Sequence, residues 1–111
     1  MSPLITLFRA LADATRIRLL VLVREGPLCV EELARALAIR QPKASRHLAY
    51  LRRAGLLKRE RSGRRIFYAF HAPPDGYSRK MLLELLGHVD STTSARKDRR
   101  RLSAARRSSR A

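Results

Sequence analysis

Apolar residues recur at helical spacing through the first part of the chain, and they predict three helices. The first begins near Pro3, where a missing backbone N–H costs little. The second follows Asp13, whose carboxylate can accept hydrogen bonds from the free N–H groups of the first turn, and it ends at Gly26-Pro27. The third spans residues 30–37, with apolar residues at i, i+3, i+4 and i+7.

A fourth helix is predicted at residues 41–55, and it organises the rest of the chain. Ala44, Leu48 and Leu51 recur at i, i+4 and i+7 and face a core, while the opposite surface is basic and rich in hydrogen-bond donors. A linker of about four residues joins it to the third helix, which is typical of a helix-turn-helix. Such a helix suits a DNA major groove, although a surface helix can also carry solvated charge without binding anything.

After Gly55 the pattern changes from helical to that of strands. Two β-prone runs flank Ser62-Gly63, which indicates a hairpin turn, and three arginines cluster near the tip: Arg61, Arg64 and Arg65. A hairpin directly after a recognition-type helix is a wing, whose arginines can reach phosphates or a narrow minor groove. The alternative is an edge hairpin whose charges prevent aggregation.

Pro73-Pro74 ends the second run, and Asp75 or Ser78 can cap a last helix with a broad apolar face. The predicted fold is mainly α with a β-hairpin wing, a winged helix-turn-helix in the order α-α-α-α-β-β-α, over residues 1–90. The first and last helices together carry more apolar surface than one such domain needs. Their pairing across a two-fold axis would bury it, so we expect a homodimer.

Residues 91–111 form an Arg/Ser-rich tail in which Leu102 is the only large apolar residue. Because such a segment cannot bury enough surface to fold alone, the sequence predicts a disordered, mobile arm. This arm is expected to contact DNA phosphates without reading bases.

Charge narrows the class of partner. Lys and Arg number 25 against 9 Asp and Glu, so the formal net charge is +16, which favours nucleic acid over acidic metabolites. The tail holds eight of the basic residues and one acid, which leaves 17 basic residues and eight acids in the first ninety residues. The first ninety residues are therefore themselves basic. A single cysteine excludes an internal disulfide, and no apolar run approaches the roughly 20 residues of a membrane span. A reducing, cytoplasmic location is expected.

Four segments together resemble the ArsR/SmtB family of bacterial winged-helix repressors over about residues 4–90. They are FRALADATRIRLL, LCVEELARAL, QPKASRHLAYLRRAGLL and the wing SGRRIFYAF. The resemblance implies a homodimer joined through the first and last helices, with the fourth helices reading successive major grooves of an inverted repeat in double-stranded DNA. By position, it also implies a set of DNA-facing residues: Gln41, Lys43, Ser45, Arg46 and His47, with Arg64 in the wing.

The chain departs from the family at the sensing sites. Arsenic-responsive members carry ELCVCDLC where this chain reads PLCVEELA, so only Cys29 keeps its sulfur and Glu31 is a poor substitute for a soft ligand. Cys29 either has a lowered pKa at a helix N-terminus and senses oxidants or electrophiles, or it is a buried core residue. Glu84 and His88 are weak candidates for a metal site, since the family's Asp-x-His pair is absent. No cofactor is expected.

An enzymatic function is not indicated. The three histidines are scattered, no Gly-rich phosphate loop occurs, and Ser45 and His47 point apart on one helix. The competing class is a winged-helix module that docks on protein or RNA and binds nucleic acid without sequence preference.

Overall fold

The computed structural model describes residues 2–110, and its elements follow the predicted order with two additions. Positions 1 and 111, which the predicted domain and tail included, lie outside the described residues. The elements are α1 (Ser2–Leu11), α2 (Ala14–Val23), β1 (Leu28–Cys29), α3 (Val30–Leu37), α4 (Gln41–Arg53), β2 (Leu57–Ser62), β3 (Arg65–Phe70), α5 (Gly76–Asp90) and α6 (Thr93–Arg110). The winged helix-turn-helix prediction is confirmed. The additions are β1 and α6.

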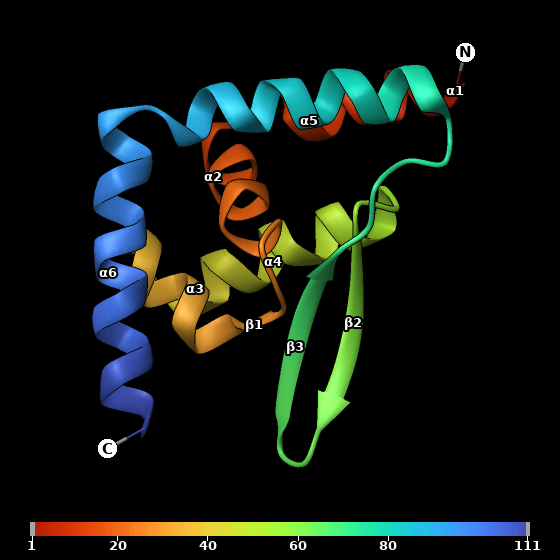
Figure 1. Cartoon of the computed structure of the whole chain (residues 1–111). Coiled ribbons are helices and arrows are strands. Elements are labelled where there is room, and N and C mark those ends of the chain that lie inside the picture. The colour runs from red at the N-terminus through yellow and green to blue at the C-terminus, as the bar shows by residue number, and fades with distance from the viewer. Residues whose placement is uncertain (1, 111) are drawn as a thin grey trace.

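Helix α2 is the centre of the structure. Its residues 19–23 are all buried, and it packs against the other five helices and strand β3. The C-terminal half of α2 is apolar on every side, so it needs neighbours on every side, and it has them. Figure 1 shows α1 and α5 across one side of the molecule, with the hairpin extending away from them.

Aspartate side chains cap the N-termini of two of the helices. The Asp13 carboxylate accepts a hydrogen bond from the backbone N–H of Arg16 at 3.1 Å and caps α2, as predicted. Of the two candidate caps for α5, the structure selects Asp75, whose carboxylate accepts from the backbone N–H and the hydroxyl of Ser78. Each cap satisfies donors that the first turn of a helix leaves unpaired.

The sheet has three antiparallel strands in the order β1-β3-β2. Ser62 pairs with Arg65, so the hairpin turn is Gly63-Arg64, one residue later than the predicted Ser62-Gly63. Gly63 has φ +62°, a conformation that glycine adopts without strain. Strand β1 was not predicted, because it contributes only two residues and runs directly into α3.

The predicted disorder of residues 91–111 is wrong where the structure describes them, because residues 93–110 form helix α6, which packs along α3 and α2. Its buried side is a stripe of four residues at i, i+3, i+7 and i+10: two alanines, one leucine and one aspartate. These residues are Ala95, Asp98, Leu102 and Ala105. The prediction assumed that residues 91–111 could fold only by burying large apolar side chains of their own. In the structure the small buried stripe of α6 packs against α3 and α2 instead.

Asp98 is the polar residue that fixes α6. Its carboxylate is 1% exposed and accepts two hydrogen bonds from Arg18 of α2, at 3.0 and 2.9 Å, and one from Arg101 at 2.8 Å. Arg101 also donates to the Ala36 carbonyl oxygen at 2.7 Å, which ties α6 to α3. The buried charge is therefore paired and fully hydrogen-bonded.

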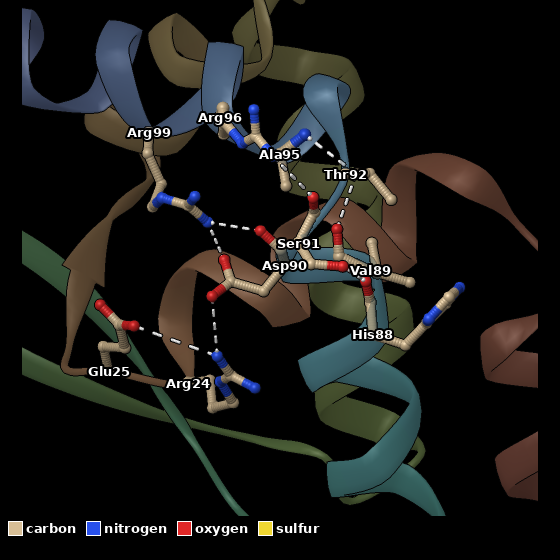
Figure 2. A network of polar contacts seen from close by, with 10 residues as sticks. All are labelled: Arg24, Glu25, His88, Val89, Asp90, Ser91, Thr92, Ala95, Arg96 and Arg99. Atoms are coloured by element: carbon tan, nitrogen blue, oxygen red, sulfur yellow. Dashed lines mark hydrogen bonds and ion pairs between the residues drawn. The ribbon is translucent and has the colours of Figure 1, made fainter.

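The turn between α5 and α6 is held by Asp90, as Figure 2 shows. Its carboxylate binds Arg24, from the end of α2, at 3.2 Å and also binds Arg99 of α6. The hydroxyls of Ser91 and Thr92 donate to carbonyl oxygens of the last turn of α5, each at 2.6 Å. The direction of α6 relative to α5 is thus set by side chains from three helices.

Replacing Asp98 by Ala should destabilise the fold by about 1–3 kcal/mol, because it removes charge-assisted hydrogen bonds while leaving two arginines that are partly exposed and can be hydrated. Urea denaturation would measure the loss, and hydrogen exchange should show that it is concentrated in α6. The control is Glu84→Ala, which removes an exposed acid with no ion pair among the described residues. Equal protection of α6 amides in both variants would contradict this role for Asp98.

Candidate nucleic-acid interface

Helix α4 presents the surface that the sequence predicts to face DNA. Ala44, Leu48 and Leu51 are buried beneath it, and Pro42 occupies its first turn. The side chains of Gln41, Lys43 and Arg46 are exposed, whereas Ser45 and His47 are half-buried. The structure therefore brings three of the five predicted residues of this helix fully to the surface.

His47 and Tyr50 attach α4 to the helix beneath it. The His47 Nδ1 atom lies 3.9 Å from the Asp13 carboxylate, and the imidazole side chain is 18% exposed. The Arg16 guanidinium stacks over the Tyr50 ring at 4.1 Å and donates to the Ala10 carbonyl oxygen at 2.8 Å. His47 and Tyr50 therefore face the start of α2, and neither side chain lies on the fully exposed side of α4.

The connection between α3 and α4 is short and sharply bent. Ala38 ends α3 in the left-handed conformation, with φ +55° and ψ +44°. The Ile39 backbone N–H then donates to the Ala34 carbonyl oxygen at 3.0 Å. A non-glycine residue in this region carries a cost of about 1 kcal/mol, which the helices packed on both sides offset.

The hairpin carries exposed arginines at its end. Arg61, Arg64 and Arg65 are all exposed, and the turn lies at the far end of the hairpin from the helices (Figure 1). From residue 41 to residue 65 the chain has nine basic residues and one acid, Glu60. Helix α4 and the hairpin thus form a strongly positive surface, which a polyanion would match.

Cys29 lies in the core and does not have the environment of a reactive thiol. It is 1% exposed, and its Sγ donates to the Glu32 carboxylate at 3.2 Å. Burial raises the pKa of the thiol to about 11, with Glu32 adding to the effect through that hydrogen bond and its charge. The expectation of a lowered pKa at this helix N-terminus is therefore wrong, and the core-packing alternative fits the structure.

The candidate metal residues are not assembled into a site. Glu84 and His88 are exposed on α5, and Asp90 nearby is engaged with two arginines. Within residues 2–110 no three His, Cys, Asp or Glu side chains are grouped so that they could hold a metal ion. Across this described part of the chain, every helix is too short or too polar to traverse a lipid bilayer.

Residues 13–59 match the family model of the bacterial regulatory proteins of the arsR family. The chain is 42% identical over 81 residues to the arsenical resistance operon repressor of Escherichia coli K12, covering 72% of this chain and 69% of that protein. The chain belongs to the ArsR family. The resemblance inferred from the sequence is confirmed, and this is a family of regulatory proteins rather than enzymes.

Two further ArsR relatives show how far the similarity extends. The arsenic resistance transcriptional regulator ArsR1 of Pseudomonas putida is 54% identical over 65 residues, 58% of this chain, so the match spans about half (51%) of that protein's length. A homodimeric winged helix-turn-helix DNA-binding domain from Mycobacterium bovis, described as a possible ArsR-family transcriptional regulator, superimposes with a TM-score of 0.63 at 26% identity. That alignment covers 80% of this chain and 76% of the domain.

The Cys29 thiol should resist alkylation in the folded protein. A pKa raised from 9.0 to about 11 lowers the thiolate fraction near neutral pH about a hundredfold, and burial slows the reaction further. Iodoacetamide labelling followed by mass spectrometry, in buffer and in denaturing urea, would measure the ratio of rates. Similar rates in the two conditions would mean that the N-terminus of α3 opens readily and that a sensing role for Cys29 should be reconsidered.

Proposed function

We propose that this protein is a homodimeric transcriptional repressor of the ArsR type that binds an inverted-repeat operator in the cytoplasm. The observation that carries the proposal is the exposed basic surface of α4, set on a helix-turn-helix and continued by an arginine-tipped wing. The similarity to the arsenical resistance operon repressor of Escherichia coli supports the same function.

Within each half-site, α4 enters the major groove and the hairpin reaches the backbone or minor groove beside it. Lys43 and Arg46 supply donors for base edges or phosphates, and Gln41 can both donate and accept. Arg64 and Arg65 act at the tip of the wing. Ser45 and His47 lie on the flank of the helix and are assigned secondary contacts because each is half-buried.

Dimerisation is proposed through α1 and α5. Four large hydrophobic side chains of these helices are exposed: Ile5 at 44%, Phe8 at 47%, Tyr77 at 69% and Leu83 at 40%. Burying such residues against a second copy would stabilise a dimer, and the Mycobacterium domain, which is described as homodimeric, supports dimerisation itself. An inverted repeat follows from the two-fold symmetry, because each subunit then meets an identical half-site.

The signal that releases the operator is proposed not to be a soft metalloid held at Cys29. One sulfur per subunit, hydrogen-bonded to a carboxylate and buried, lacks the two or three thiolates that give tight binding. Formation of an adduct on this thiol would require the N-terminus of α3 to open. We therefore assign Cys29 no role other than core packing.

The competing proposal is a winged-helix module that docks on protein or RNA. Selection from a random duplex library separates the two, because a repressor enriches one inverted repeat whereas the module enriches none. The exposed α4 residues favour the repressor, since a face rich in bidentate donors suits base recognition.

Replacing Arg46 by Ala should weaken binding to the selected operator by about 1–3 kcal/mol, because a base or phosphate loses a charged donor. Folding should be unchanged, since the side chain is exposed. Fluorescence anisotropy at fixed salt would measure the affinity. Lys80→Ala, which removes an exposed charge from α5, is the control, and an equal loss in the two variants would contradict the placement of α4 in the groove.

Replacing Phe8 by Glu should raise the dimer dissociation constant at least about thirtyfold, the loss of about 2 kcal/mol typical of a central interface aromatic. Sedimentation velocity without DNA would detect the monomer. Ile66→Glu is the matched control, because Ile66 is 36% exposed but lies on the hairpin. Intact dimers of the Phe8 variant would exclude α1 from the interface.

A further inference from the structure

Helix α6 displays a second basic surface that lies outside α4 and the hairpin. The exposed basic residues are spaced so that they lie on the side of the helix opposite its buried stripe. We name them the α6 ridge: Arg96, Lys97, Arg100 and Arg107. Arg96, Arg100 and Arg107 lie at i, i+4 and i+11, so they form one row along the helix, with Lys97 beside it.

The charge of this ridge is not neutralised within the described residues. The only acid of α6, Asp98, is buried and fully engaged by Arg18 and Arg101. Other α6 arginines that do have acidic partners are Arg99, with Asp90, and Arg106, with Glu32. Arg96 donates a hydrogen bond to the Ser91 carbonyl oxygen at 3.3 Å, and among residues 2–108 the side chains of Lys97, Arg100 and Arg107 make no ion pair or hydrogen bond. The ridge therefore remains available to an external anion.

The ridge is also held in a fixed place beside the helix-turn-helix. Helix α6 packs along α3, and α3 in turn packs against α4 and against the sheet from which the wing extends. In Figure 1 the C-terminal end of α6 and the turn of the hairpin point the same way, away from α5, with α3 between them. Contacts from Arg101 to Ala36 and from Arg106 to Glu32 keep α6 against α3.

We propose that the α6 ridge binds the phosphate backbone of duplex DNA on the far side of the helix-turn-helix from the wing. The inference rests on the proposed function, because it places α4 and the wing on the same DNA. The ridge is a row of basic side chains with no exposed acid among them, so it is complementary to a line of phosphates. Because the opposite side of α6 is packed against α3 and α2, α6 cannot enter a DNA groove to contact base edges. The ridge adds affinity without adding sequence preference.

The test compares two triple variants that lose the same charges. The ridge variant is Lys97→Gln with Arg100→Gln and Arg107→Gln, and the control is Arg9→Gln with Arg79→Gln and Lys80→Gln, all exposed residues of α1 and α5. Because these two helices are the proposed dimer interface, sedimentation velocity first compares the dimers of both variants with that of the parent, and DNA is titrated at a protein concentration at which all three are dimeric. Each full-length variant is titrated against a random-sequence duplex and against the operator selected by the parent protein, over a range of salt concentrations.

The ridge variant should bind both duplexes roughly tenfold more weakly than the parent, with a salt slope smaller by about one for each phosphate that the ridge no longer neutralises. The ratio of operator to random affinity should stay unchanged, and the control should stay within about twofold of the parent. Phosphate ethylation interference should disappear at one group of backbone positions in the ridge variant and persist at the rest.

Equal affinities and salt slopes for the parent and the ridge variant would overturn the proposal, and would leave an acidic protein as the alternative occupant of the ridge. An equal loss in both triple variants, with the ethylation pattern unchanged, would also overturn it, since only net charge would then matter. If the parent itself does not distinguish operator from random duplex, the proposed function fails. The random duplex still decides the role of the ridge in that case.

Discussion

Enclosure of α2 is the constraint on which the rest of the structure depends. An apolar helix surrounded by other elements fixes where each of them can lie, and its arginines then select particular partners. Arg16 reaches the ring of Tyr50 on α4, Arg18 reaches Asp98 on α6, and Arg24 reaches Asp90 at the end of α5. One helix thus positions the recognition helix, the basic C-terminal helix and the helix proposed to form the dimer.

The elements that were predictable from the sequence are those whose cause is local. Helical spacing, the Asp13 cap and the change of period after Gly55 lie within single segments, so α2, α3, α4 and the hairpin follow from the residues themselves. Helix α6 does not. Its buried stripe contains one large apolar residue, Leu102, and an acid, and the arginine that makes burial of this acid favourable lies 80 residues earlier in the chain. Strand β1 is equally non-local, because only pairing with β3 defines it.

Candidate site residues show the same division. Exposure of Gln41, Lys43 and Arg46 follows from helix periodicity, but the approach of His47 to Asp13 depends on how α4 crosses the start of α2. At Cys29, position at the start of a helix suggests an acidic thiol, because the N-terminal dipole favours the thiolate. Burial and the neighbouring Glu32 carboxylate outweigh that effect and raise the pKa. The sign of such a shift depends on packing, which the sequence does not display.

Asp90 has a mechanical consequence. Its two carboxylate oxygens are held by arginines from two different helices, so the end of α5 cannot rotate or slide alone without breaking both ion pairs together. The two ion pairs therefore couple α6 to the end of α5, the proposed dimer helix. The hairpin is joined to α5 in sequence through residues 71–75, while its strand β3 also packs against α2 and α3. In the proposed dimer, a shift of α5 would therefore carry α6 and the end of α2 with it.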